Sequence, residues 1–135
     1  MPEKKPFITL EQAQEIIADV PTPFHLYDEK GIRANARLVN KAFAWNKGFK
    51  EYFAVKATPN PYLLRILKEE GCGVDCASLT ELMLVHACGF QGREIMFSAN
   101  DVPPEEFRLA RKLGAYVNLD DVTHVAALRE NGGIP

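Results

Sequence analysis

The stretch EYFAVKATPNP, residues 51–61, combines an apolar strand with an abrupt turn. Five of its first seven residues suit a buried strand, and the prolines that follow are typical of a loop. A lysine, Lys56, stands near the end of this predicted strand. Burying an ammonium group is costly unless it has a partner, so the position of Lys56 needs a chemical or structural reason.

The rest of the chain repeats the same pattern of strand and helix. Strands recur at intervals of about 21 residues, the size of a compact strand-loop-helix-loop unit. Glycines at Gly71, Gly89 and Gly114 follow the predicted helices, where a left-handed cap favours glycine. Strands are expected at residues 51–57, 73–77, 94–99 and 115–119, and helices at 31–43, 61–70, 79–88, 103–113 and 121–130.

Apolar strands that alternate with helices are typical of an α/β protein with a parallel sheet. Right-handed crossovers leave an open doubly wound sheet or a TIM (β/α)8 barrel. A full barrel has eight strands in about 250 residues, whereas this chain has four main units in 135 residues. We expect a partial TIM barrel, about half of one, with a complete four-stranded open sheet as the alternative. Residues 1–21 are expected to form a helical lead-in and residues 22–135 the barrel segment.

Composition and charge are those of an ordinary globular protein. The chain is 47% hydrophobic and 25% charged, with a net charge of −2 and an isoelectric point near 5.9. This charge balance does not indicate binding to nucleic acid or to an anionic membrane. No apolar run approaches the roughly 20 residues needed to span a bilayer, and the start, MPEKKPFITL, lacks the apolar core of a secretion signal. A cytoplasmic protein is expected.

Three cysteines, Cys72, Cys76 and Cys88, raise the possibility of a zinc site together with His86. If residues 72–76 are extended at about 3.3 Å per residue, the Cα atoms of Cys72 and Cys76 lie roughly 13 Å apart. Two thiolates, each about 2.3 Å from one zinc ion, can hardly span that distance. We therefore expect reduced thiols and no metal site.

Lys56 has two interpretations on its residue type and position alone. It shares a strand face with Ala54, and the carboxyl end of a barrel strand points into the mouth where active sites form. Partial burial lowers the pKa of a lysine and frees its amine to form a Schiff base with an aldehyde, most commonly pyridoxal phosphate. Alternatively, Lys56 simply extends its amine to solvent.

Two longer segments resemble a known family. YFAVKATPNPYLLRIL (residues 52–67) and EEGCGVDCASLTEL (69–82) resemble the lysine-bearing part of the alanine-racemase-fold pyridoxal-phosphate decarboxylases. That family includes diaminopimelate, ornithine and arginine decarboxylases. TPFHLYDE (22–29) resembles the entry segment typical of diaminopimelate decarboxylases, and FSAND (97–101) resembles a later strand end. Two features depart from the family pattern: Thr58 replaces the usual asparagine, and Phe53 separates Tyr52 from Ala54.

The resemblance implies roles for five residues. Lys56 carries pyridoxal 5'-phosphate as a Schiff base, Asp75 and Glu81 are the acidic residues of the active site, and Asn100 contributes to cofactor binding. Ala54 leaves space beneath the amine for a flat ligand. For Asp75, Glu81 and Asn100, a structural role without catalysis is the alternative.

Asp75 stands near a helix start, where its charge interacts favourably with the helix dipole. Glu81 completes a capping box with Ser78, and a strand-end asparagine such as Asn100 commonly makes a turn. Other polar residues are expected to be structural: His25, His86 and His124 at packing positions, and Arg33, Arg37 and Lys41 on a solvated helix face.

The function implied by the resemblance is that of diaminopimelate decarboxylase, which makes L-lysine from meso-diaminopimelate, a small amino-acid substrate, as a homodimer. The segment VDCAS (74–78) is closer to the ornithine-type enzymes, so ornithine, arginine or carboxynorspermidine decarboxylase is the alternative. A pyridoxal-phosphate-binding or scaffold domain without catalysis is another. The family's phosphate-binding segment, pyridine-nitrogen partner and carboxyl-terminal β-domain are expected beyond Pro135, so the 135 residues alone should have little decarboxylase activity.

Overall fold

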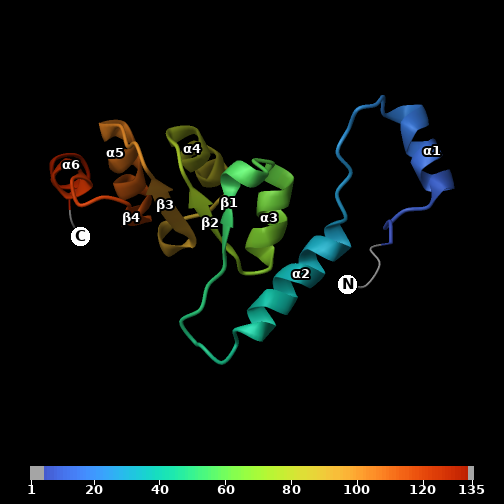
Figure 1. The fold of residues 1–135 in the computed structure, drawn as a ribbon, viewed down its shortest axis with the longest axis horizontal. Helices are drawn as coiled ribbons and strands as arrows, with labels where there is room; N and C mark the ends of the chain where they lie inside the picture. The colour runs from blue at the N-terminus through green and yellow to red at the C-terminus, as the bar shows by residue number, and fades with distance from the viewer. Residues whose placement is uncertain (1–4, 134–135) are drawn as a thin grey trace.

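In the computed structural model, residues 5–133 form six α-helices and a parallel four-stranded sheet (Figure 1). The strands are β1 (Tyr52–Ala54), β2 (Gly73–Cys76), β3 (Ile95–Ala99) and β4 (Tyr116–Leu119). The helices are α1 (Leu10–Asp19), α2 (Glu29–Ala42), α3 (Pro61–Glu69), α4 (Leu79–Ala87), α5 (Pro104–Leu113) and α6 (His124–Asn131), with 3₁₀ turns η1 (Val55–Ala57) and η2 (Gly92–Glu94). No helix in this part of the chain is both long and apolar enough to cross a membrane.

The strands follow one another across the sheet in chain order, β1-β2-β3-β4, and every pair is parallel. Helices α3 to α6 follow one another along one side of the sheet (Figure 1). A doubly wound sheet reverses its strand order at a switch point, and this sheet has no such reversal among residues 5–133. This arrangement confirms the α/β class and the partial TIM barrel.

The core lies between the sheet and its helices. Along β3, Ile95, Phe97 and Ala99 are buried toward the helices, while Met96 and Ser98 are half-buried on the other face. Burying one large apolar side chain contributes about 1.5–3 kcal/mol. The fully buried side chains that form the centre of this core are Val55, Leu64, Val74, Cys76, Leu82, Val85, Phe90, Ile95, Phe97 and Phe107.

The helix ends have the caps that the sequence predicts. Asn60 accepts a hydrogen bond from the Tyr62 N–H at 2.9 Å, and Pro61 occupies the first helical position. The glycines after α3, α4 and α5 (Gly71, Gly89 and Gly114) have φ angles of 84°, 87° and 71°. These left-handed conformations are costly for residues that carry a Cβ.

Two predicted elements differ from the structure by three residues at one end, and the others by at most two. The strand expected over residues 51–57 ends at Ala54, and the 3₁₀ turn η1 follows, closed by a 3.1 Å bond from the Thr58 N–H to the Val55 carbonyl. The last helix begins at His124, because the Asp121 carboxylate accepts the Thr123 N–H at 2.8 Å and holds the preceding residues in a turn.

The expectation of a solvated basic face on α2 is confirmed for Arg37 and Lys41, which are exposed, and is wrong for Arg33, whose side chain is 23% exposed. The Glu70 carboxylate, only 8% exposed, accepts hydrogen bonds from both Arg37 and Arg33, and Arg33 also pairs with Glu69. Hydrogen bonds from Arg37 and then Arg33 hold the pKa of Glu70 below its ordinary value. This network joins α2 to α3, while Lys41 remains exposed.

Candidate functional site

The candidate site lies at the carboxyl ends of β1 and β2. Ala54 and Asp75 are register partners on these neighbouring strands. Val74 and Cys76 are buried toward the helices, so Asp75 between them points to the other face of the sheet. That face corresponds to the interior of a barrel, where the side chains at the carboxyl ends of strands form active sites.

Lys56 lies beyond the end of its strand and not on it. It is exposed in the turn η1, two residues after Ala54. Burial raises the pKa of Asp75, the positive charge of Lys56 lowers it, and the negative charge of Glu81 raises it again. The net pKa of Asp75 is above its ordinary value. The structure therefore brings these three groups together, within electrostatic reach of one another.

Asp75 has a free acceptor. Its Oδ1 atom is buried and makes no hydrogen bond with any residue in the described range 5–133. Leaving a buried polar atom unpaired costs about 1–3 kcal/mol, and natural structures rarely do so without a reason. The unpaired carboxylate oxygen lies next to the small Ala54 side chain and within electrostatic reach of Lys56. This arrangement fits an aldehyde cofactor held by the lysine, with the carboxylate available to a donor.

Glu81 helps to form the start of α4, as the sequence indicates, but its carboxylate accepts a hydrogen bond from a different residue than in a capping box. Its N–H donates to the Ser78 Oγ at 3.3 Å, as in a capping box. Its own carboxylate accepts the N–H of Ala77 at 2.9 Å, one residue before the N-cap residue. The carboxylate that accepts the Ala77 N–H is therefore also the one whose charge acts on Asp75.

Asn100 is not brought into this group. It follows β3 at the same end of the sheet, in an exposed bend, and its side chain makes no hydrogen bond within residues 5–133. Of the predicted site residues, the structure gathers Ala54, Lys56, Asp75 and Glu81 around the ends of β1 and β2.

Sequence reasoning missed Glu106. This residue of α5 is only 7% exposed, and its Oε1 accepts the Leu79 N–H at the start of α4, at 2.7 Å. A signal was present in the sequence, because position 106 shares its helix face with the buried residues Phe107 and Ala110. A glutamate on the apolar face of an amphipathic helix is expected to be buried, and a buried charge needs a hydrogen-bond partner.

The remaining titratable candidates either do not face the same side of the sheet as Asp75 or lie on other elements, although the charges of Glu81 and Asp75 also act on the neighbouring Cys76. Cys72, Cys76 and Cys88 are buried free thiols, and burial raises the pKa of Cys76 to about 12. Across residues 5–133 no three His, Cys, Asp or Glu side chains gather closely enough to hold a metal ion. His25 and His86 are exposed, and His124 is half-buried.

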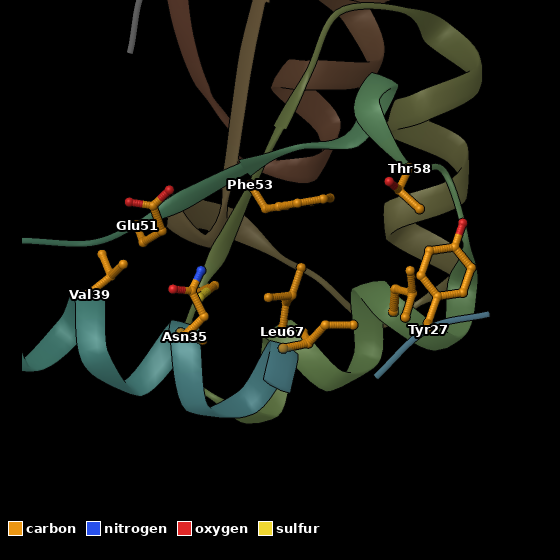
Figure 2. A pocket seen from close by; sticks show the side chains of 11 residues that line it. Tyr27, Asn35, Val39, Glu51, Phe53, Thr58 and Leu67 are labelled. Atoms are coloured by element: carbon orange, nitrogen blue, oxygen red, sulfur yellow. The ribbon is translucent and has the colours of Figure 1, made fainter. Parts of the chain in front are cut away.

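A separate apolar groove, with a volume of about 310 Å³, lies between β1, α2 and α3 (Figure 2). Phe53 projects into it from β1, Asn35 from α2 and Leu67 from α3. Neither Lys56 nor Asp75 lines this groove. Since Phe53 and Ala54 are consecutive strand residues, the groove and the candidate site lie on opposite faces of β1.

Comparisons with known proteins agree with this geometry. Residues 29–132 match the family model described as pyridoxal-dependent decarboxylase, pyridoxal binding domain. The chain is 45% identical to Protein TabA of Pseudomonas amygdali pv. tabaci over 107 residues, 79% of this chain and 25% of that protein. It is 33% identical to the diaminopimelate decarboxylase of Methanothermobacter thermautotrophicus over 119 residues, 87% of this chain and 28% of that enzyme.

The fold also matches solved structures. The ornithine decarboxylase of Entamoeba histolytica superposes with a TM-score of 0.74 and 30% sequence identity, over 90% of this chain and 38% of that chain. The chain thus spans about a quarter of the length of the curated relatives that it matches.

Proposed function

The chain belongs to the pyridoxal-dependent decarboxylases, whose pyridoxal-binding domain its residues 29–132 match, and on this premise we propose that it forms part of an enzyme that decarboxylates a small amino acid. The observation that carries the proposal is the group at the ends of β1 and β2: an exposed lysine whose charge acts on a carboxylate with an unpaired, buried oxygen. Residues 22–135 would be the barrel segment of that enzyme, and residues 1–21 a helical lead-in.

In this proposal Lys56 holds pyridoxal 5'-phosphate covalently through its Nζ atom. The bound cofactor supplies an electron sink for the electron pair that the departing α-carboxylate leaves behind. Lys56 would hold the cofactor through Nζ, and the same amine would serve to move a proton to the product. Its location in a short turn after β1 lets the amine move while the strand stays fixed.

Asp75 attracts the ammonium form of Lys56 and offers Oδ1 to a donor on the cofactor or substrate. Glu81 acts through its charge and through its hydrogen bond to the Ala77 N–H in the turn before α4. Ala54, the register partner of Asp75, leaves room for a flat ring. Asn100 is kept as a candidate for cofactor binding, although its side chain makes no hydrogen bond with residues 5–133.

For the substrate we propose meso-diaminopimelate, with L-lysine as product. The support is the similarity to diaminopimelate decarboxylases, of which the chain covers only part. The likeness to an ornithine decarboxylase structure favours ornithine or a related diamine precursor, such as the arginine or carboxynorspermidine substrates, as the second candidate. We further propose a cytoplasmic homodimer, as the resemblance implies. A pyridoxal-phosphate-binding or scaffold domain without catalysis remains the alternative from another class.

The experiment that tests the function is product analysis on the full-length protein that contains this segment. Diaminopimelate, ornithine and arginine are supplied in turn, with added pyridoxal phosphate, and the amine products are identified by mass spectrometry. L-lysine from diaminopimelate, lost in Lys56→Ala and retained in the exposed control Lys47→Ala, is the expected result. Release of no product from any of the three substrates would refute all three substrate assignments, and the 135 residues alone should release little or none.

A further inference from the structure

Glu106 is a charged residue that is only 7% exposed. It lies in the first turn of α5, next to Phe107, which is 1% exposed, and one turn before Ala110. A carboxylate at such a position loses its hydration and requires protein donors in exchange.

Only one of its oxygens has such a donor. Oε1 accepts the Leu79 N–H at 2.7 Å, a distance typical of a charge-assisted hydrogen bond. Oε2 is buried and has no hydrogen-bond partner in the described part of the chain. A methionine of similar length would fill the same space without an unpaired oxygen, so packing alone does not account for a carboxylate here.

The donor, Leu79, is the first residue of α4, and it lies in the turn that joins the two acidic residues of the candidate site. Asp75 precedes this turn and Glu81 follows it. Within the turn, the Ala77 N–H donates to Glu81 and the Glu81 N–H donates to Ser78. These two bonds are local, whereas the bond to Glu106 ties the turn to a different helix, 27 residues further along the chain.

We propose that Glu106 is a positioning residue: through the Leu79 amide it fixes the turn between β2 and α4, and so keeps Asp75 and Glu81 in place beside Lys56. The proposal deepens the proposed function and rests on it for its catalytic meaning. The positioning itself is a property of the cofactor-free chain and is measured there.

The test compares Glu106→Ala and Glu106→Gln with the control Glu105→Ala, an exposed neighbour in the same helical turn. Amide hydrogen exchange of Leu79 and the titration of the Asp75 carboxyl are followed by NMR in the cofactor-free 135-residue chain. In Glu106→Ala we expect exchange at Leu79 to become about 10- to 100-fold faster, as for the loss of a hydrogen bond to a charged group. Glu106→Gln, which keeps an acceptor, should show a smaller increase, and Glu105→Ala none.

The Asp75 titration distinguishes positioning from stability. The Lys56 and Glu81 charges both act on Asp75, and its burial raises its pKa. If the turn loosens in Glu106→Ala, Glu81 moves away and water reaches Asp75, so the pKa of Asp75 should fall toward its ordinary value. A folded Glu106→Ala variant with unchanged Leu79 exchange and an unchanged Asp75 titration would overturn the proposal.

A measurement on the unaltered chain covers the case in which Glu106→Ala does not fold. The Leu79 amide proton should shift in step with the protonation of the Glu106 carboxyl, because the two share a hydrogen bond. A Leu79 resonance that does not respond to that protonation would also overturn the proposal. Because no cofactor is present, failure here is separate from failure of the full-length protein to decarboxylate an amino acid.

Discussion

Replacing Asp75 with asparagine should make the chain more stable at neutral pH while removing the carboxylate beside Lys56. Burial raises the pKa of Asp75, which means that the folded state disfavours its ionised form. A buried, unpaired acceptor costs about 1–3 kcal/mol. Because Asp75 is only partly buried, solvent screening reduces the effect, and we expect a gain of about 0.5–1 kcal/mol from Asp75→Asn.

The pH dependence follows from the direction of the shift. A carboxyl group whose folded pKa is raised contributes stability below its unfolded pKa and loses it as the pH rises through the folded value. The advantage of Asp75→Asn should therefore be present at pH 7 and should shrink as the pH is lowered and Asp75 becomes protonated. Urea unfolding at pH 7 and at successively lower pH values measures this difference.

The matched control is Asp101→Asn, an exposed carboxylate at the same end of the sheet, which should change stability by less than about 0.5 kcal/mol. If Asp75→Asn instead lowers stability at pH 7, Asp75 makes a net favourable interaction in the cofactor-free chain. The reasoning that its free oxygen is kept for a ligand would then be refuted.

Three further predictions concern the rest of the fold. Glu70→Gln should weaken the packing of α2 against α3. The lowered pKa of Glu70 contributes stability above its unfolded pKa, and this stability is lost as the pH falls through the folded value. The Tm of the variant should therefore be lower than that of the unaltered chain at pH 7 and equal to it in acid, and an unchanged Tm at pH 7 would contradict this. Leu64→Ala, at a fully buried site, should cost about 2–5 kcal/mol in urea unfolding, and a cost below 1 kcal/mol would show that the core packs elsewhere. The outer edges of β1 and β4 are unpaired in this sheet, so the isolated chain should self-associate in light scattering, and a strictly monomeric species at high concentration would count against it.

The repeated unit of the fold could be predicted from local patterns. Apolar runs, capping residues and glycines each act within a few residues, so the Asn60–Pro61 start of α3 and the Gly114 end of α5 were correctly predicted. The end of β1 was not, because a 3₁₀ turn and a strand can contain the same apolar residues, and only pairing with a neighbour distinguishes them. The sheet pairs Ala54 with Asp75 and carries the ladder no further along β1.

Side chains that find distant partners could not be predicted in this way. The spacing of Arg33 and Arg37 describes one helix face, but it contains no information about Glu70 on another helix. Glu106 and Leu79 are likewise separated by 27 residues. In the candidate site, the family pattern predicted the residue types, and the structure added that Asp75 lies within electrostatic reach of Lys56 and keeps one oxygen unpaired.

The central claim is that Lys56 is the lysine built to receive an aldehyde cofactor. The 135-residue chain is incubated with a limiting amount of pyridoxal 5'-phosphate, reduced with borohydride, and digested, and tandem mass spectrometry then gives the modified fraction of each lysine. The account predicts that Lys56 is modified ahead of exposed lysines such as Lys47 and Lys112, and that Asp75→Asn removes this preference. Equal modification of Lys56 and the other exposed lysines in the unaltered chain would contradict it.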